Sequence, residues 1–282
     1  AGRGQKLHQS EVKIAALELG LPVLQPEKLK APEFVEAMQA LRPDLGIVIA
    51  FRMLPEVIWA MPGLGTFNLH ASLLPQYRGA APINWAIING ETETGVTTFL
   101  LNHEIDKGGI IDQIRVPILP EDNVGTLYDK LMTTGTALVT STVDRIAAGD
   151  IRPVEQQHID ESTLRPAPKI FKEDCRIDWT LPGRRIADFI RGLSPYPAAW
   201  TEMFREGDEV SQSAKLFSAA FEAAAHGQPC GTVESDGRTF IRVACADGWI
   251  IPGELQIAGK KRLPVRDLLL GWRDVSQYKF RK

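Results

Sequence analysis

The sequence has few of the residues that would indicate a metal centre, a disulfide framework or a membrane anchor. Its three cysteines, Cys175, Cys230 and Cys245, are odd in number and form no metal-ligand cluster, which suits a reducing compartment. No apolar run approaches the roughly 20 residues needed to cross a bilayer, and no signal-like segment opens the chain. We therefore expect a cytoplasmic protein.

Three common nucleotide-binding and catalytic motifs are also missing. No Gly-x-Gly-x-x-Gly follows a predicted strand and no Walker-type loop occurs, so neither a dinucleotide nor a nucleoside triphosphate is indicated. Ser72 does not lie in a Gly-x-Ser-x-Gly turn, and the cysteines are far downstream, so no activated nucleophile is evident. These absences favour direct group transfer over a covalent enzyme intermediate.

Length and charge set further limits. At 282 residues the chain exceeds the usual size of one domain, so we expect two. A formal charge of -3 and a pI of about 6.0 argue against a general polyanion binder. Any contact with a nucleic acid must therefore use local basic patches.

The first half of the chain alternates between strand and helix patterns. Predicted helices occupy residues 32–41, 82–90 and 123–148, and predicted strands occupy 46–51, 96–101 and 109–118. The unbroken apolar run at 46–51 predicts a strand that is buried on both faces. The alternation predicts an α/β layered fold.

Three polar residues stand at or beyond the ends of predicted strands in this half. Asn68 and His70 are two apart, so their side chains leave the same face of a strand, and Asp106 follows the next strand. Taken singly, each is more often a turn former than a catalytic group. Together they offer a hydrogen-bond donor, a tunable proton carrier and a carboxylate, and loops at the carboxyl ends of strands bring such groups into one crevice.

The motifs around these three residues resemble those of the folate-dependent formyltransferases. The resemblance rests on the run 68–75 (Asn-Leu-His-Ala-Ser-Leu-Leu-Pro), on 77–79 (Tyr-Arg-Gly) and on Asp106 with Gly108, and it extends along the whole chain. It implies that Asn68, His70 and Asp106 are catalytic. It also implies a tetrahydrofolate site formed by Ser72, Leu73, Leu74 and Pro75.

The same resemblance implies a reaction and its partners. The formyl donor is expected to be 10-formyltetrahydrofolate, with no metal, and the expected acceptor is the α-amino group of methionine on initiator tRNA. The glycine-rich basic loop at residues 1–7 matches a loop that contacts tRNA in that family. The three-residue cationic run at 260–262 is usually a solvated turn, but together with the basic loop and the linker cations it offers a discontinuous track for phosphates. The expected tRNA-binding residues are Arg3, Lys6, Lys260, Lys261 and Arg262.

The second half reads as a separate domain. Residues 166–180 form the expected linker, and beyond it short apolar runs separated by Asp236-Gly237 and Asp247-Gly248 predict β-hairpins. The full expectation is α/β in class: a Rossmann-like domain with a mostly parallel sheet at 1–165, then a small OB-like β-barrel at 181–282. The resemblance further implies that the family's first strand, helix and second strand are absent from this sequence. We expect a monomer.

Two alternative functions remain open. Formylation of a small amine, such as a glycinamide ribotide or an amino sugar nucleotide, would need the same Asn68, His70 and Asp106. The other alternative is a noncatalytic RNA-binding module built on a formyltransferase domain that has lost its activity. The intact set of three residues weighs against it.

Overall fold

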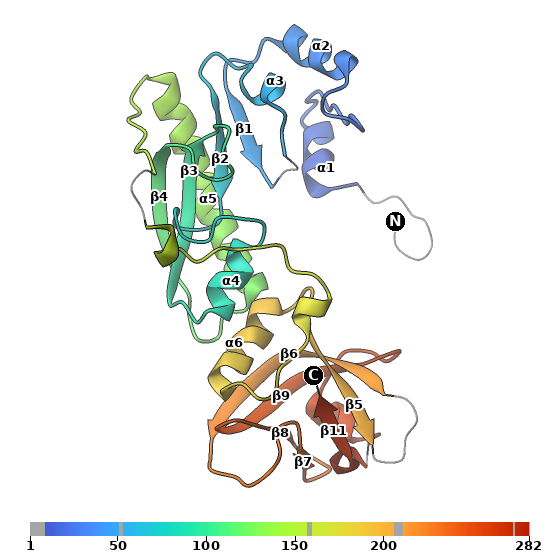
Figure 1. Cartoon of the computed structure of the whole chain (residues 1–282). Helices are drawn as coiled ribbons and strands as arrows, with labels where there is room; N and C mark the ends of the chain where they lie inside the picture. The colour runs from blue at the N-terminus through green and yellow to red at the C-terminus, as the bar shows by residue number, and fades with distance from the viewer. Residues whose placement is uncertain (1–8, 51–52, 157–159, 206–210, 273, 282) are drawn as a thin grey trace. The chain divides into compact units, whose positions relative to one another are not determined.

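The computed structural model describes residues 9–50, 53–156, 160–205, 211–272 and 274–281 (Figure 1). The chain divides into two compact units, Ala1–Thr66 and Phe67–Lys282. Arg3 and Lys6, two of the expected tRNA contacts, lie outside the described residues. Within the described residues, no helix is long and apolar enough to cross a membrane.

The first unit contains three helices and one strand among its described residues. They are α1 (Glu11–Glu18), α2 (Pro32–Leu41), β1 (Gly46–Ile49) and α3 (Glu56–Trp59). Helix α1 begins where Ser10 accepts a hydrogen bond from the backbone N–H of Lys13 at 3.3 Å. Pro32 opens α2 in the first turn, where a missing N–H leaves no helical bond unmade.

Strand β1 corrects one expectation. The side chains of Ile47 and Ile49 are 46% and 57% exposed, whereas Val48 is buried. The prediction that this strand is buried on both faces is therefore wrong for the described residues. An apolar run predicts what a strand is able to bury, whereas Ile47 and Ile49 keep about half of their surface exposed.

The second unit begins with an antiparallel part of the sheet that carries the candidate site. Its elements are β2 (Thr66–His70), α4 (Pro82–Ile88), β3 (Glu93–Leu100), β4 (Ile110–Pro117) and α5 (Val124–Ala147). Strand β3 pairs antiparallel with both β2 and β4. Helix α5 runs along one face of this sheet (Figure 1) and buries Leu127, Leu131 and Leu138 in an apolar cluster.

The rest of the second unit is a nearly closed antiparallel barrel preceded by a helix. The helix is α6 (Gly183–Leu193). The strands are β5 (Ala199–Arg205), β6 (Gln212–Ala223), β7 (Val233–Ser235), β8 (Ile241–Cys245), β9 (Gly248–Ile257), β10 (Leu263–Pro264) and β11 (Tyr278–Arg281), with a short helix α7 (Val265–Leu269). They pair in the order β11-β5-β6-β9-β8-β7, and β10 pairs with β9.

The barrel closes where Thr232, just before β7, bridges to Lys279 of β11. The backbone N–H of Phe280 donates to the carbonyl of Gly231 at 2.8 Å at the same point. Both predicted Asp-Gly hairpins form, the first between β7 and β8 and the second between β8 and β9.

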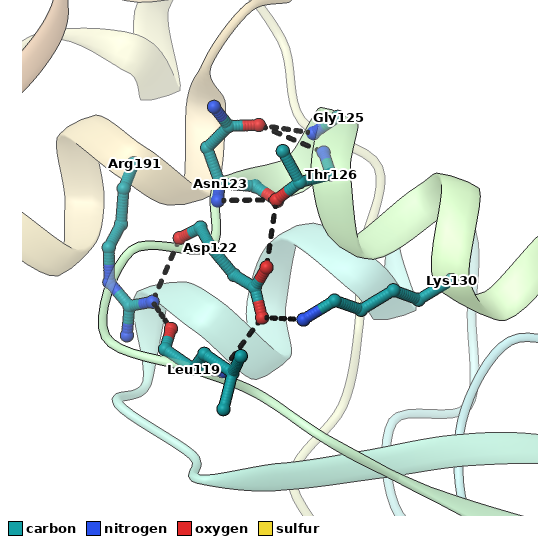
Figure 2. A network of polar contacts seen from close by, with 7 residues as sticks. All are labelled: Leu119, Asp122, Asn123, Gly125, Thr126, Lys130 and Arg191. Atoms are coloured by element: carbon teal, nitrogen blue, oxygen red, sulfur yellow. Dashed lines mark hydrogen bonds and ion pairs between the residues drawn. The ribbon is translucent and has the colours of Figure 1, made fainter.

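A polar network joins the loop before α5 to helix α6 (Figure 2). The carboxylate of Asp122 accepts hydrogen bonds from Lys130 at 2.6 Å, from the backbone N–H of Leu119 at 2.7 Å and from the Thr126 hydroxyl at 3.0 Å. Arg191 of α6 donates to the carbonyl of Asp122 at 3.0 Å. The α/β part and the barrel part of this unit are thereby hydrogen-bonded to each other.

Candidate active site

Strand β2 determines which side chains face the candidate site. Leu69 faces α5, because a Cβ atom placed on Gly135 of that helix would lie 2.8 Å from the Leu69 side chain. Asn68 and His70 therefore leave the opposite face of the sheet. Both are almost fully buried, at 6% and 7% exposed.

The His70 ring is oriented by the loop that follows its strand. Its Nε2 atom lies 2.9 Å from the carbonyl oxygen of Tyr77. A carbonyl oxygen only accepts hydrogen bonds, so Nε2 carries the proton in this arrangement. In the neutral ring, Nδ1 is then the atom with a free lone pair, able to accept a proton.

The predicted folate loop, residues 72–75, is fixed by side chains from two neighbouring strands. The Thr97 hydroxyl donates to the carbonyl of Ser72 at 2.6 Å and accepts from the backbone N–H of Leu74 at 3.2 Å. Gln113 of β4 donates to the carbonyl of Leu74 at 2.8 Å and to the Thr97 hydroxyl at 2.9 Å. Four residues that are consecutive in sequence are thus held in one conformation by β3 and β4.

Sequence reasoning gave no role to Thr97 and did not single out Gln113. Both lie directly across the sheet from His70, since His70 pairs with Thr97 and Thr97 pairs with Gln113. The available signal was a glutamine in the middle of β4, next to Asp112. Its meaning depends on the register of three strands, which the sequence alone does not provide.

Asp106 is held in an unusual backbone conformation beyond β3. Its φ angle is 54°, in the left-handed region that costs a residue with a side chain on the order of 1–3 kcal/mol. Its Oδ2 atom accepts a hydrogen bond from the backbone N–H of Gly79 at 2.9 Å. Gly79 has to be glycine, because its φ is 127° and a Cβ atom there would lie 2.4 Å from the carbonyl oxygen of Ala167.

The structure brings Asp106 and His70 to the same loop but does not join them. Among the described residues no hydrogen bond links the imidazole to the carboxylate. The imidazole instead donates to the carbonyl of Tyr77, and the carboxylate accepts from the backbone N–H of Gly79. The expected route of convergence also needs correction. Strands β2 and β3 are antiparallel, so their carboxyl ends point to opposite ends of the sheet. The loops that follow the two strands bring Asp106 next to Gly79.

A segment preceding the barrel braces that loop from the other side. We call residues 163–168 the strap. The Gln76 side chain donates to the carbonyl of Thr163 at 3.2 Å and accepts from the backbone N–H of Arg165 at 2.8 Å. The backbone N–H of Tyr77 donates to the carbonyl of Arg165 at 2.7 Å, and that of Ala167 donates to the carbonyl of Arg78 at 2.8 Å. The strap therefore runs alongside the loop as a short extra strand.

Tyr77 adds a buried polar contact to this brace. Its hydroxyl donates to Glu91 at 2.6 Å, and Glu91 also pairs with Arg165 of the strap. Burial and the contact with Glu91 raise the pKa of Tyr77, while the neighbouring Arg165 acts in the opposite direction. The phenol thus stays protonated and keeps donating at neutral pH.

Two of the three cysteines have buried thiols. Burial raises the pKa of Cys175 to about 11, and burial likewise raises the pKa of Cys245. A protonated thiol is a poor nucleophile. Among the described residues no group of three or more His, Cys, Asp or Glu side chains is arranged to hold a metal ion.

The predicted cationic run of the barrel is not uniform. Lys260 and Lys261 are exposed in the turn between β9 and β10. Arg262 instead pairs with Glu254, and its guanidinium lies 4.1 Å from the centre of the Phe217 ring. The charge of Arg262 is therefore already compensated within the barrel, whereas the two lysines face solvent.

Comparison with protein families places the chain. A family model described as formyl transferase matches residues 1–143, and a second, described as formyl transferase, C-terminal domain, matches residues 169–273. The chain belongs to the formyl transferase family. This membership confirms the predicted class, a Rossmann-like domain followed by a barrel, although the β2–β3 and β3–β4 pairings are antiparallel.

Several relatives in the family are similar over almost the whole chain. The methionyl-tRNA formyltransferase of Bacteroides thetaiotaomicron is 57% identical over 281 residues, which cover 99% of this chain and 87% of that protein. The methionyl-tRNA formyltransferase of Parabacteroides distasonis is 56% identical, with coverage of 98% and 85%.

Solved structures show the same fold at lower identity. HypX from Aquifex aeolicus, solved in complex with tetrahydrofolic acid, has a TM-score of 0.61 and 23% identity, and the match covers 83% of this chain and 40% of HypX. The sugar 3N-formyl transferase WlaRD, solved with dTDP and 5-N-formyl-THF, has a TM-score of 0.60 and 20% identity, with coverage of 90% and 83%.

Proposed function

We propose that this formyl transferase moves the formyl group of 10-formyltetrahydrofolate to the α-amino group of methionine on initiator tRNA. The observation that carries the proposal is that relatives named methionyl-tRNA formyltransferase match almost the whole chain. The burial of Asn68 and His70 and the fixed carboxylate of Asp106 support the same reaction. A small-amine acceptor is not favoured by the names of these relatives.

The reaction begins when the neutral amine attacks the formyl carbon. A carbon–nitrogen bond forms, and negative charge develops on the formyl oxygen. The Asn68 amide is the group we assign to that oxygen, because a donor fixed in a buried site stabilises charge where it develops. Its place on the face of β2 shared with His70 supports this role.

His70 and Asp106 handle the proton. Because Nε2 of His70 is occupied by the carbonyl of Tyr77, the neutral ring has only Nδ1 to offer. Nδ1 takes the proton of the attacking amine and, as the imidazolium, returns it to the folate nitrogen as the bond from that nitrogen to the formyl carbon breaks. The Asp106 carboxylate, which the backbone N–H of Gly79 holds in place, is assigned to help remove the amine proton, directly or through water.

The loop at residues 72–75 is the part of the proposed donor site that the structure describes most fully. Ser72, Leu73, Leu74 and Pro75 begin one residue after His70, and Thr97 and Gln113 hold the loop's backbone. The Ser72 hydroxyl is itself used locally, donating to the carbonyl of Gln76 at 2.7 Å. We therefore assign this loop to shaping the folate pocket and not to the chemistry.

The tRNA would be held by cations at separate places. Lys260 and Lys261 are available in the barrel, and Lys169 and Lys172 lie just beyond the strap. Lys172 stacks over the Trp200 ring, with its Nζ 6.0 Å from the ring centre. Arg3 and Lys6 belong to the proposal through the family resemblance alone.

One comparison of acceptors tests the function. The full-length protein is given 10-formyltetrahydrofolate with charged initiator tRNA, with a dTDP-amino sugar or with glycinamide ribotide, and formylated product is measured for each. We expect efficient turnover with the charged tRNA only. Efficient formylation of either small amine without turnover of the tRNA would overturn the proposal, and activity with none would favour a noncatalytic role.

A further inference from the structure

We propose that Gln156 is a positioning residue that holds the Asp106 carboxylate in its working orientation. This inference rests on the proposed function, in which Asp106 takes part in proton transfer. Gln156 lies 50 residues beyond Asp106 in the sequence, after α5, and it touches neither Asn68 nor His70 among the described contacts.

The Gln156 amide uses both of its ends. Its Nε2 donates to the carbonyl of Asp106 at 3.1 Å and to the carbonyl of Gly108 at 2.8 Å, so one amide spans the turn that contains the aspartate. Its Oε1 accepts from the guanidinium of Arg78 at 2.8 Å. The side chain therefore connects the Asp106 turn to the loop that follows β2.

Arg78 completes a closed ring of contacts. Its Nε donates to the same Asp106 carbonyl at 3.2 Å, and the next residue, Gly79, donates its backbone N–H to the Asp106 carboxylate at 2.9 Å. Both the carbonyl and the carboxylate of Asp106 are thus bound by residues 78 and 79. Gln156 is the third corner, because it binds Arg78 and Asp106 together.

This ring addresses a specific weakness of the Asp106 turn. A left-handed φ of 54° is unfavourable for an aspartate, so the backbone tends to relax toward the right-handed region, which would swing the carboxylate away from Gly79. Gly108 lies so close to the carbonyl oxygen of Leu100 that only glycine fits there, since a Cβ atom placed on it would lie 1.6 Å from that oxygen. The Gln156 amide holds the carbonyls of Asp106 and Gly108 at once and so opposes that relaxation.

A glutamine is needed because the ring requires a donor and an acceptor on one short side chain. In Gln156→Glu the acceptor for Arg78 remains, but the two donated bonds are lost and a carboxylate faces two carbonyl oxygens. In Gln156→Met the length is kept and all three bonds are lost. Displacing a reacting group by about 1 Å can cost on the order of 10²-fold in rate. We expect kcat to fall roughly tenfold to a hundredfold in both variants, with KM for the donor and for the tRNA within about twofold.

A double-mutant cycle separates positioning from general structural support. We would measure kcat, both KM values and the melting temperature for Gln156→Met, Asp106→Asn and the double variant in the full-length protein. If Gln156 acts through Asp106, adding Gln156→Met to Asp106→Asn costs little further kcat. Gln39→Glu, on the exposed side of α2, adds the same charge as Gln156→Glu and should leave all values unchanged.

Each outcome decides the inference. An unchanged kcat in Gln156→Met, an additive loss in the double variant, or loss of folding in both Gln156 variants would overturn it. If Asp106→Asn alone keeps full turnover, the proposed chemistry fails, and the inference that rests on it is overturned. If the wild-type protein formylates a small amine instead of the tRNA, the same cycle is run with that amine, since Gln156 is assigned to the carboxylate and not to the acceptor.

Discussion

Replacing Asp122 by asparagine should destabilise the second unit by an amount that depends on pH. The Asp122 side chain is only 4% exposed and accepts hydrogen bonds from Lys130, Leu119 and Thr126 (Figure 2). Burial acts to raise the pKa of this carboxyl, but the bonds from Lys130, the Leu119 N–H and Thr126 outweigh it, so the pKa lies below its usual range. The folded protein therefore favours the charged form.

The size of the effect follows from which contacts survive. An asparagine oxygen can still accept a hydrogen bond from the Leu119 N–H. The ionic contact with Lys130 is lost, because a neutral amide oxygen is a weaker acceptor for the ammonium group than a carboxylate. Hydrogen bonds to charged groups contribute about 1.5–3 kcal/mol. Because Lys130 is partly exposed and regains water, we expect a loss near the lower end, about 1.5 kcal/mol at pH 7.

The stability difference between wild type and Asp122→Asn should decrease at low pH. A carboxyl whose pKa is lowered on folding stabilises the folded state above its unfolded pKa of about 3.9, and that contribution is lost as the pH falls through the lower folded value. The gap between wild type and Asp122→Asn should thus stay constant from pH 7 to about 5 and shrink below about 4. Urea unfolding followed at several pH values measures it.

The control for this prediction is Asp129→Asn, which removes a charge from an exposed position of the same helix, α5. It should change the free energy of unfolding by less than about 0.5 kcal/mol at every pH. A gap for Asp122→Asn that does not vary with pH, or one no larger than that of Asp129→Asn, would refute the reasoning.

The remaining predictions concern catalysis and binding. Asp106→Asn should lower turnover about 10²- to 10⁴-fold while donor binding, measured by titration with a folate analogue, changes little. Leu74→Asp should weaken donor binding and spare tRNA binding; equal weakening of both would indicate misfolding. Lys260→Ala combined with Lys261→Ala should weaken tRNA binding and reduce its salt slope, whereas Arg262→Ala should chiefly lower the melting temperature, because Glu254 already compensates that charge. A salt slope unchanged by the lysine pair would contradict their assignment.

Local signals in the sequence were sufficient for most of the helices and turns. Asn123 and Thr126 form a capping box at the start of α5, and Pro32 opens α2, so both helices begin where their sequences indicate. The two Asp-Gly turns likewise set the hairpins of the barrel. In each case the deciding interaction joins residues that are a few positions apart.

Features that depend on distant partners were not predictable in this way. The antiparallel pairing of β2 with β3 changes the route by which Asp106 reaches the site, and no local pattern encodes it. The reach of Gln156 to Asp106 and the pairing of Arg262 with Glu254 also depend on the folded backbone. Charge and residue type indicated candidate groups, but pairing decided which of them remain available.

The loop at residues 77–79 orients two side chains of the candidate site through its main-chain atoms. His70 binds the carbonyl of Tyr77, and Asp106 binds the N–H of Gly79, so both side chains are oriented by main-chain atoms. Main-chain atoms persist through most substitutions, but they move with the loop. The strap fixes that loop mainly through its own backbone, and at Gly79 the two segments lie so close that a Cβ atom would be 2.4 Å from the carbonyl oxygen of Ala167. The strap therefore influences the orientation of His70 and Asp106 through its hydrogen bonds to the loop. These bonds are mostly between backbone atoms, so they depend less on the side chains of the strap than on the absence of a Cβ atom at Gly79.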